Sequence, residues 1–139
     1  MVDDPQLALG KWPVEQIPGP DSLFMRIHRN WVINGAPMPG AFRNRGRGMS
    51  TNWSKHSTPE ETRQQGVKPE ENGVIRMQVR QVRSIKSQVV EHTPKPLNRA
   101  HTDVAGEKDS EARLKFLRIY DWDISPPAPL SSDSGAQDR

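Results

Sequence analysis

The stretch that decides the fold alternates between apolar and polar side chains, Leu23-Phe24-Met25-Arg26-Ile27-His28. A period of two puts the apolar side chains at alternate positions on one face of a strand and places Arg26 and His28 on the other. Residues 74–79 alternate in the same way, and the shorter segments 88–92 and 102–105 have the composition of strands. We therefore expect half-buried strands in a small mixed or antiparallel sheet.

Two short helices are predicted beside these strands. Thr58 is a suitable N-cap, a proline follows at the first helical position, and Glu61 stands where a capping box needs an acidic residue. Gly66 and Pro69 end this helix by residue 68. A second helix is predicted over residues 111–119, whose apolar residues recur at spacings of three and four. The fold class expected is α+β, and the 13 prolines and 10 glycines predict many loops.

Composition favours one domain with irregular ends. The chain has 139 residues, and its hydrophobic share of 32% indicates a modest core. Four prolines within residues 1–21 predict an extended acidic arm, residues 22–120 hold all the predicted strands and helices, and residues 121–139 have the Pro/Ser/Asp composition of a disordered acidic tail.

Charge is sorted along the chain. The chain as a whole carries +3, residues 1–21 carry −3, and residues 120–139 also carry −3, which leaves +9 on residues 22–119. A surplus of this size attracts polyanions, so nucleic acid is the partner that we expect first. The two ends are candidates for contact with a protein partner.

Several classes of protein are disfavoured. Without cysteine there is no disulfide framework and no thiolate site, which is typical of a reducing compartment. We find no apolar run of membrane-spanning length and no secretory signal pattern, so we expect a cytoplasmic protein with no membrane contact. No phosphate-binding glycine loop, zinc-protease or serine-hydrolase motif occurs, so no cofactor is expected.

A nucleic-acid interface is the first functional hypothesis. Basic side chains spread over the body are candidates for phosphate contacts, and a tryptophan is a candidate for stacking on a base. The residues are Arg43, Arg45, Arg47, Lys55, Arg76, Arg80, Arg83 and Lys86, with Trp53 or Trp31 as the stacking partner. The alternative is an ordinary solvated basic face with both tryptophans buried in the core.

Catalysis is the second hypothesis. If His92 and His101 converge, they are able to act as acid and base in a metal-independent cleavage of RNA, with Arg26 holding a phosphate and His28 nearby. The alternative is that each histidine forms only a structural hydrogen bond. A metal site is not expected, because His92 and His101 have no further ligand at a recognised spacing.

Two other classes remain open. The order of elements, with Arg26 on an early strand, Ser50-Thr51 on a later one and Glu91 as a possible acidic residue, is similar to that of ADP-ribosyltransferase toxins. An accessory subunit of a larger complex needs no active site and agrees equally well with a loop-rich composition.

Short motifs between residues 23 and 108 also resemble a pattern found in a family of small uncharacterised prokaryotic proteins. The motifs are Arg26-Ile27-His28, Ala41-Phe42, Met49-Ser50, Pro94-Lys95-Pro96-Leu97-Asn98-Arg99-Ala100-His101 and Gly106-Glu107-Lys108. The resemblance implies a bacterial or archaeal origin and assigns no catalytic residue. The favoured interpretation is a small basic module that binds nucleic acid or another polyanion and has no chemistry of its own.

Overall fold

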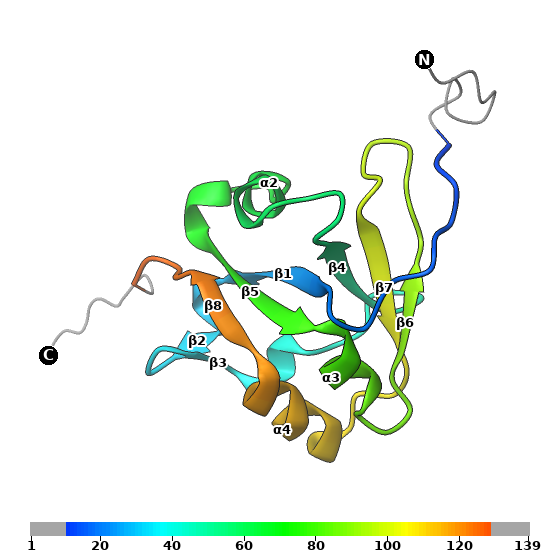
Figure 1. Cartoon of the computed structure of the whole chain (residues 1–139). Helices are drawn as coiled ribbons and strands as arrows, with labels where there is room; N and C mark the ends of the chain where they lie inside the picture. Colours follow the sequence, from blue (N-terminus) through cyan, green and yellow to red (C-terminus); the bar gives the residue numbers. More distant parts are fainter. Residues whose placement is uncertain (1–10, 129–139) are drawn as a thin grey trace, which may run out of the picture.

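A six-stranded antiparallel sheet forms the centre of the protein (Figure 1). The structure is a computed structural model that describes residues 11–128. The strand order is β6-β7-β4-β1-β5-β8. The bounds are β1 Ser22–His28, β4 Met49–Trp53, β5 Asn72–Gln78, β6 Val89–His92, β7 His101–Ala105 and β8 Asp121–Ile124. A separate two-stranded sheet joins β2 (Val32–Ile33) to β3 (Ala36–Pro37). The predicted α+β class is confirmed.

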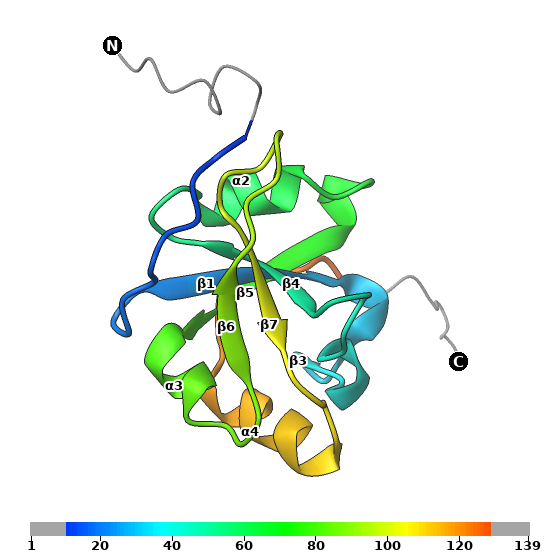
Figure 2. The same cartoon turned by 90° about the vertical axis from the view of Figure 1, so that its right-hand side faces the viewer.

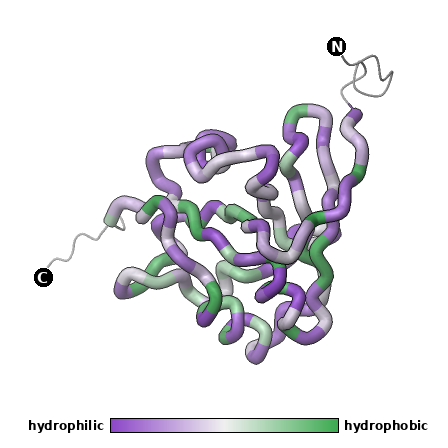
Figure 3. The backbone as a smooth tube through the Cα atoms, viewed as in Figure 1, coloured by the Kyte–Doolittle hydropathy of each residue, from purple (hydrophilic) through white to green (hydrophobic). Residues whose placement is uncertain are grey.

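The helices lie on both faces of this sheet (Figures 1 and 2). One face is covered by α3 (Val79–Arg83) and α4 (Ser110–Ile119), and α2 (Pro59–Gln64) lies over β1 and β5 on the other. Short 3-10 turns complete the connections; they are η1 (Arg29–Trp31), η2 (Pro39–Ala41) and η3 (Pro69–Glu71). Figure 3 shows that α2 itself is mostly hydrophilic.

The alternation in β1 separates the two faces as predicted. Leu23, Met25 and Ile27 are at most 5% exposed and join one hydrophobic core, to which α4 contributes Phe116. Arg26 lies on the opposite face and is exposed. The strand register extends this separation to β5, where Met77 and Ile75, the partners of Leu23 and Met25, belong to the same core. We call these the core face and the polar face of the sheet.

Both predicted helix starts form as capped termini. The Thr58 hydroxyl accepts a hydrogen bond of 3.1 Å from the Glu61 backbone N–H, and α2 ends before Gly66. In α4 the Asp109 carboxylate accepts a bond of 2.8 Å from the Ala112 N–H. These side chains satisfy backbone donors that the first helical turn leaves unpaired.

Two segments differ from the expectation. Residues after Gln78 turn into α3, because Val79 and Val82 are both fully buried against the core. Asp121–Ile124 forms edge strand β8 where the tail was predicted to begin, since Trp122 pairs with Ile75 and packs on the core. The rest of the predicted tail beyond residue 128 and the first ten residues of the predicted arm lie outside the described residues.

Residues 11–20 run along the body as an irregular segment (Figure 2). Ile17 is 5% exposed and belongs to the core, and Glu15 contacts Lys55, His56 and Arg99. Glu15 of the predicted acidic arm is thus bound by basic side chains of the folded domain, and its negative charge offsets part of their positive charge.

A gap in the pairing of β1 positions the candidate site. All seven residues of β1 pair with β5, but only Leu23 and Phe24 pair with β4. Beyond Phe24 the strands β1 and β4 separate, so the polar face has an opening between Arg26 on β1 and Ser50 on β4. That opening holds the cleft described below.

Candidate functional site

A cleft of about 700 Å³ lies on the polar face. Its floor is formed by β1 and β4, and its walls come from α2, the loop before β4 and the turn between β6 and β7. Polar side chains that line it include Arg26, Ser50, Asn52, Asn98 and His101. Segments that are far apart in the sequence, between residues 24 and 101, therefore meet at this cleft.

Arg26 stands on the floor of this cleft. One guanidinium nitrogen donates a 3.1 Å hydrogen bond to the Thr62 carbonyl of α2, and no carboxylate within residues 11–128 forms an ion pair with it. The side chain keeps contact with solvent, but the walls remove part of its water, and this desolvation and the charge of Arg45 lower the pKa of Arg26 from its ordinary value. An arginine remains charged after such a shift.

Further cations surround the opening. Arg43, Arg45, Lys68 and Lys95 all line the cleft, and the Arg43 guanidinium lies 4.6 Å from the centre of the Trp31 ring. Glu71 is the single carboxylate among the lining residues. The cleft is therefore strongly positive, and its potential favours an anionic ligand.

His28 and Glu71 close the end of the cleft near η3. The His28 Nε2 lies 2.7 Å from a Glu71 oxygen, and the other carboxylate oxygen accepts a 3.3 Å bond from Arg29. The hydrogen bond from His28 is the main cause that lowers the pKa of Glu71. Glu71 is therefore already neutralised by its neighbours and subtracts little from the charge of the cleft.

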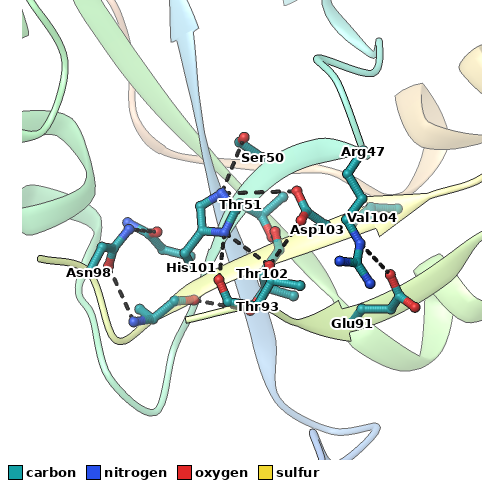
Figure 4. A network of polar contacts seen from close by, with 12 residues as sticks. Arg47, Ser50, Thr51, Glu91, Thr93, Asn98, His101, Thr102, Asp103 and Val104 are labelled. Atoms are coloured by element: carbon teal, nitrogen blue, oxygen red, sulfur yellow. Dashed lines mark hydrogen bonds and ion pairs between the residues drawn. The ribbon is translucent and has the colours of Figure 1, made fainter. Parts of the chain in front are cut away.

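His101 lies in a hydrogen-bonded network at the opposite end (Figure 4). Its Nδ1 is 3.0 Å from both the carbonyl and the hydroxyl oxygen of Thr93, and its Nε2 is 3.4 Å from the Ser50 hydroxyl. Asp103 lies on the same polar face, with one oxygen 4.0 Å from Nε2 and the other accepting a 3.0 Å bond from the Thr93 hydroxyl. These contacts hold the imidazole ring in one orientation.

Asn52 fixes the wall beside His101. Its amide nitrogen donates to Thr62 at 3.0 Å and to Gln65 at 2.9 Å, and its oxygen accepts a 2.8 Å bond from the Asn98 amide. The side chain is 3% exposed. Asn52 thus joins β4, α2 and the turn before β7, and it determines how closely the two walls of the cleft approach.

The structure brings together only part of the predicted catalytic set. Arg26, His28 and His101 line one cleft, whereas His92 does not. His92 pairs in register with Thr102, the residue after His101, so the two imidazoles point to opposite faces of the sheet. An acid and base pair made of His92 and His101 on one phosphate is incompatible with this geometry.

His92 has a structural role on the core face. It is 5% exposed, accepts a 2.9 Å hydrogen bond from the Glu15 N–H through Nδ1 and contacts the Arg99 carbonyl at 2.8 Å through Nε2. Its ring stacks on His56 and meets the edge of Trp53. These contacts attach the segment before β1 to the sheet.

His28 and His101 are also far apart. Phe24, Asn52 and His101 form one row across the strands. His28 lies four residues beyond Phe24 along β1, a separation of about 13 Å in a strand. These two histidines are unable to act on the same phosphate.

Trp53 does not lie on the nucleic-acid surface where it was predicted as a stacking residue. It is 1% exposed, and its indole N–H donates a 2.8 Å bond to Asp21. The register explains the burial, because Trp53 pairs with Leu23 and therefore faces the core. A base is unable to reach this ring in the folded protein.

The other predicted phosphate contacts divide into three groups. Arg43 and Arg45 line the cleft, while three further cations are paired with carboxylates: Arg47 with Glu91 at 3.5 Å, Lys55 with Glu15 at 2.6 Å and Arg76 with Asp123 at 3.3 Å. Arg80, Arg83 and Lys86 are exposed in and after α3, on the core-face side. The predicted basic wall is therefore not a single surface.

A second cleft, of about 750 Å³, separates the segment before β1 from β6. It is lined by Arg47 and Arg83 together with Glu15 and Glu91, and His92 closes its inner side. Positive and negative groups alternate there, so it lacks the one-signed charge of the first cleft. Glu91, the possible acidic residue of a transferase, is bound to Arg47 in this region.

The predicted site residues did not include Asn52, Lys68, Lys95 or Asn98, and Ser50 was named only in the comparison with ADP-ribosyltransferase toxins. Ser50 and Asn52 occupy alternate positions along β4, between Met49, Thr51 and Trp53, and this period of two was the available signal for their shared face. Lys95 and Asn98 belong to the turn whose ends pair through an isolated bridge, and nothing in the spacing shows that the turn folds over β4.

Comparisons of the chain with models of protein families, with curated proteins and with solved structures find no match. Within residues 11–128 no helix is long and apolar enough to cross a membrane. The same residues contain no group of three or more acidic or histidine side chains arranged to hold a metal ion.

Proposed function

We propose that the cleft on the polar face binds the phosphates of a single-stranded nucleic acid. The observation that carries this proposal is the Arg26 guanidinium on the floor, surrounded by four further cations and by one carboxylate that is already paired. Guanidinium groups match the geometry of phosphate oxygens, and partial removal of water strengthens their attraction.

A chain of phosphates fits this arrangement better than one compact anion. The five cations come from β1, the loop before β4, the segment after α2 and the turn between β6 and β7. Cations on separate walls of an open cleft are able to contact successive phosphates along a strand. A duplex is not favoured, because the functional groups lie inside a recess rather than on a projecting helix or ribbon.

Binding of this kind is mainly electrostatic. Trp53 is buried, and Arg43 lies over one face of the Trp31 ring, so the cations and not the aromatic rings supply most of the contacts. Backbone contacts carry no sequence information. We therefore expect weak sequence preference and a strong dependence on salt.

The test is fluorescence anisotropy with short labelled RNA and DNA strands over a series of salt concentrations. We expect binding at low salt that weakens as salt rises. In the double variant Arg45→Gln, Lys95→Gln, both exposed residues are changed. Its affinity should fall about tenfold or more, and the slope of log K against log salt should decrease by about 1.4, since each phosphate contact contributes about 0.7 for a single strand.

The matched control is Arg80→Gln, Lys86→Gln, which removes the same charge from exposed positions outside the cleft. It should keep the affinity within about twofold of the unmodified protein, because its long-range effect is screened by salt. An equal loss of affinity in both double variants would show that the strand is attracted by the overall charge of the protein and not by the cleft. Absence of binding to either strand at low salt would refute the proposed function.

A further inference from the structure

The cleft contains a nucleophile and a base in contact. Ser50 is exposed on β4, and its hydroxyl lies 3.4 Å from the Nε2 of His101, which is only 7% exposed. The serine oxygen is thus the accessible atom, and the imidazole lies behind it. Contacts of this kind are often longer before substrate binds than in the reacting complex.

The surroundings of His101 define which of its nitrogens carries the proton. The Thr93 carbonyl, 3.0 Å from Nδ1, is only an acceptor, so Nδ1 is the protonated nitrogen. The Thr93 hydroxyl donates to Asp103, and its oxygen is free to accept from the same Nδ1–H. Nε2 therefore directs a lone pair toward the Ser50 hydroxyl, which is the orientation that a general base requires.

The same surroundings suit proton transfer. Burial, together with the charges of Lys95 and Arg26, lowers the pKa of His101, and the Thr93 carbonyl and Asp103 partly oppose this shift. The ring is therefore neutral near pH 7. Once it takes a proton, the Asp103 carboxylate 4.0 Å from Nε2 stabilises the imidazolium.

The charges in the cleft select phosphoryl transfer over acyl transfer. The side-chain amide nitrogens of Asn52 and Asn98 already donate to other side chains, so neither is free to stabilise a carbonyl oxyanion. Arg26 and Lys95 instead supply positive charge near His101. Cations of this type stabilise the negative oxygens of a reacting phosphate.

We propose that Ser50 attacks a phosphodiester of the bound strand while His101 acts as its general base. This inference rests on the proposed function. The Ser50 oxygen forms a bond to phosphorus, its proton passes to His101 Nε2, and the bond to the leaving oxygen breaks on the opposite side of phosphorus, where that oxygen takes a proton from solvent. Water then attacks phosphorus from that opposite side and gives its proton to solvent, while the bond to Ser50 breaks and the Ser50 oxygen takes its proton back from His101. The net reaction consumes one water.

The test uses the full chain with uniformly ³²P-labelled single-stranded RNA and DNA in a buffer that contains a metal chelator. We expect both strands to be cleaved, because the protein supplies the nucleophile. A labelled adduct should remain on the protein after denaturation. Ser50→Ala and His101→Gln should each lower the cleavage rate by about 100-fold or more, while Ser50→Ala keeps the binding affinity within about twofold.

Ser84→Ala is the matched control, since Ser84 is an exposed serine at the end of α3. It should cleave at the unmodified rate. A strand that binds and stays intact overturns the inference and leaves the proposed function standing, whereas a strand that does not bind refutes both. Cleavage of RNA alone, unchanged in Ser50→Ala, would assign the attack to the RNA 2′-hydroxyl and overturn the role of Ser50.

Discussion

The two faces of the central sheet are built from the same strands and serve different purposes. On the core face, α3 and α4 enclose a continuous apolar cluster, in which Phe42 and Phe116 stack with ring centres 5.1 Å apart. On the polar face, α2 covers only part of the sheet, and the remainder is an open cleft lined by cations and amides. The core that stabilises the fold and the groups of the proposed binding site are therefore separated by the thickness of one sheet.

The comparison shows how a small protein is able to carry unpaired charge. Arg26 and Met25 are neighbours in sequence, yet one lies in the cleft and the other in the core. Burial of apolar surface on one face provides the stability that unpaired cations on the other do not. Substitutions on the core face should thus act on folding, whereas those of the exposed cations in the cleft should act on binding.

The largest effect on stability is expected at Phe116. Its side chain is fully buried and stacked on Phe42, so Phe116→Ala leaves a cavity and should lower the free energy of unfolding by about 3–5 kcal/mol. Urea unfolding followed by tryptophan fluorescence measures this change. A loss below about 1 kcal/mol would show that the core face is not the main source of stability.

A smaller loss is expected from Asn52→Ala on the polar face. The change removes the partner of Asn98 and the contacts to Thr62 in α2 and to Gln65 just after it, and leaving buried polar groups unpaired costs about 1–3 kcal/mol. Amide exchange in residues 95–98 should also become faster. Leu97→Ala is the control, because Leu97 is 98% exposed and its loss should change stability by less than about 0.5 kcal/mol. Equal exchange rates in the two variants would contradict this role of Asn52.

The smallest effect, and one that depends on pH, concerns Glu15. The hydrogen bond from Lys55 is the main cause that lowers the pKa of Glu15 from 4.5 to about 2, and His56 adds to it. A carboxyl with a lowered pKa stabilises the fold above pH 4.5, and this contribution disappears as the pH falls toward 2.

The measurement compares the unmodified protein with Glu15→Gln. After allowance for solvent screening, the difference in the free energy of unfolding should be about 1 kcal/mol at pH 6 and should decline between pH 4.5 and 2. A difference that grows as the pH falls would have the wrong sign for this ion pair.

The fold follows from the sequence where the local signal is strong. The alternation of β1, the Thr58 cap and the spacing of the apolar residues in α4 each predict their element. The strand β8 has only Trp122 and Ile124 as apolar residues, and Pro126 and Pro127 follow one residue after its end. Its formation depends on pairing with β5, which no local pattern encodes.

The site was predictable in part for a similar reason. Arg26 and His28 belong to one alternating strand, so their shared face could be derived. His92 and His101 both stand beside proline-rich turns, and only the register of β6 against β7 separates them. Alternation along β4 puts Ser50 on the polar face, but no local pattern places His101 beside it.

The most direct test of the separation between the two faces is a titration of ¹⁵N-labelled protein with a short single-stranded oligonucleotide, followed by two-dimensional NMR. The account predicts that the amide signals of Arg26, Ser50 and Lys95 shift progressively while those of Arg80 and Arg83 in α3 stay in place. Shifts concentrated in α3, or no shifts at low salt, would contradict it.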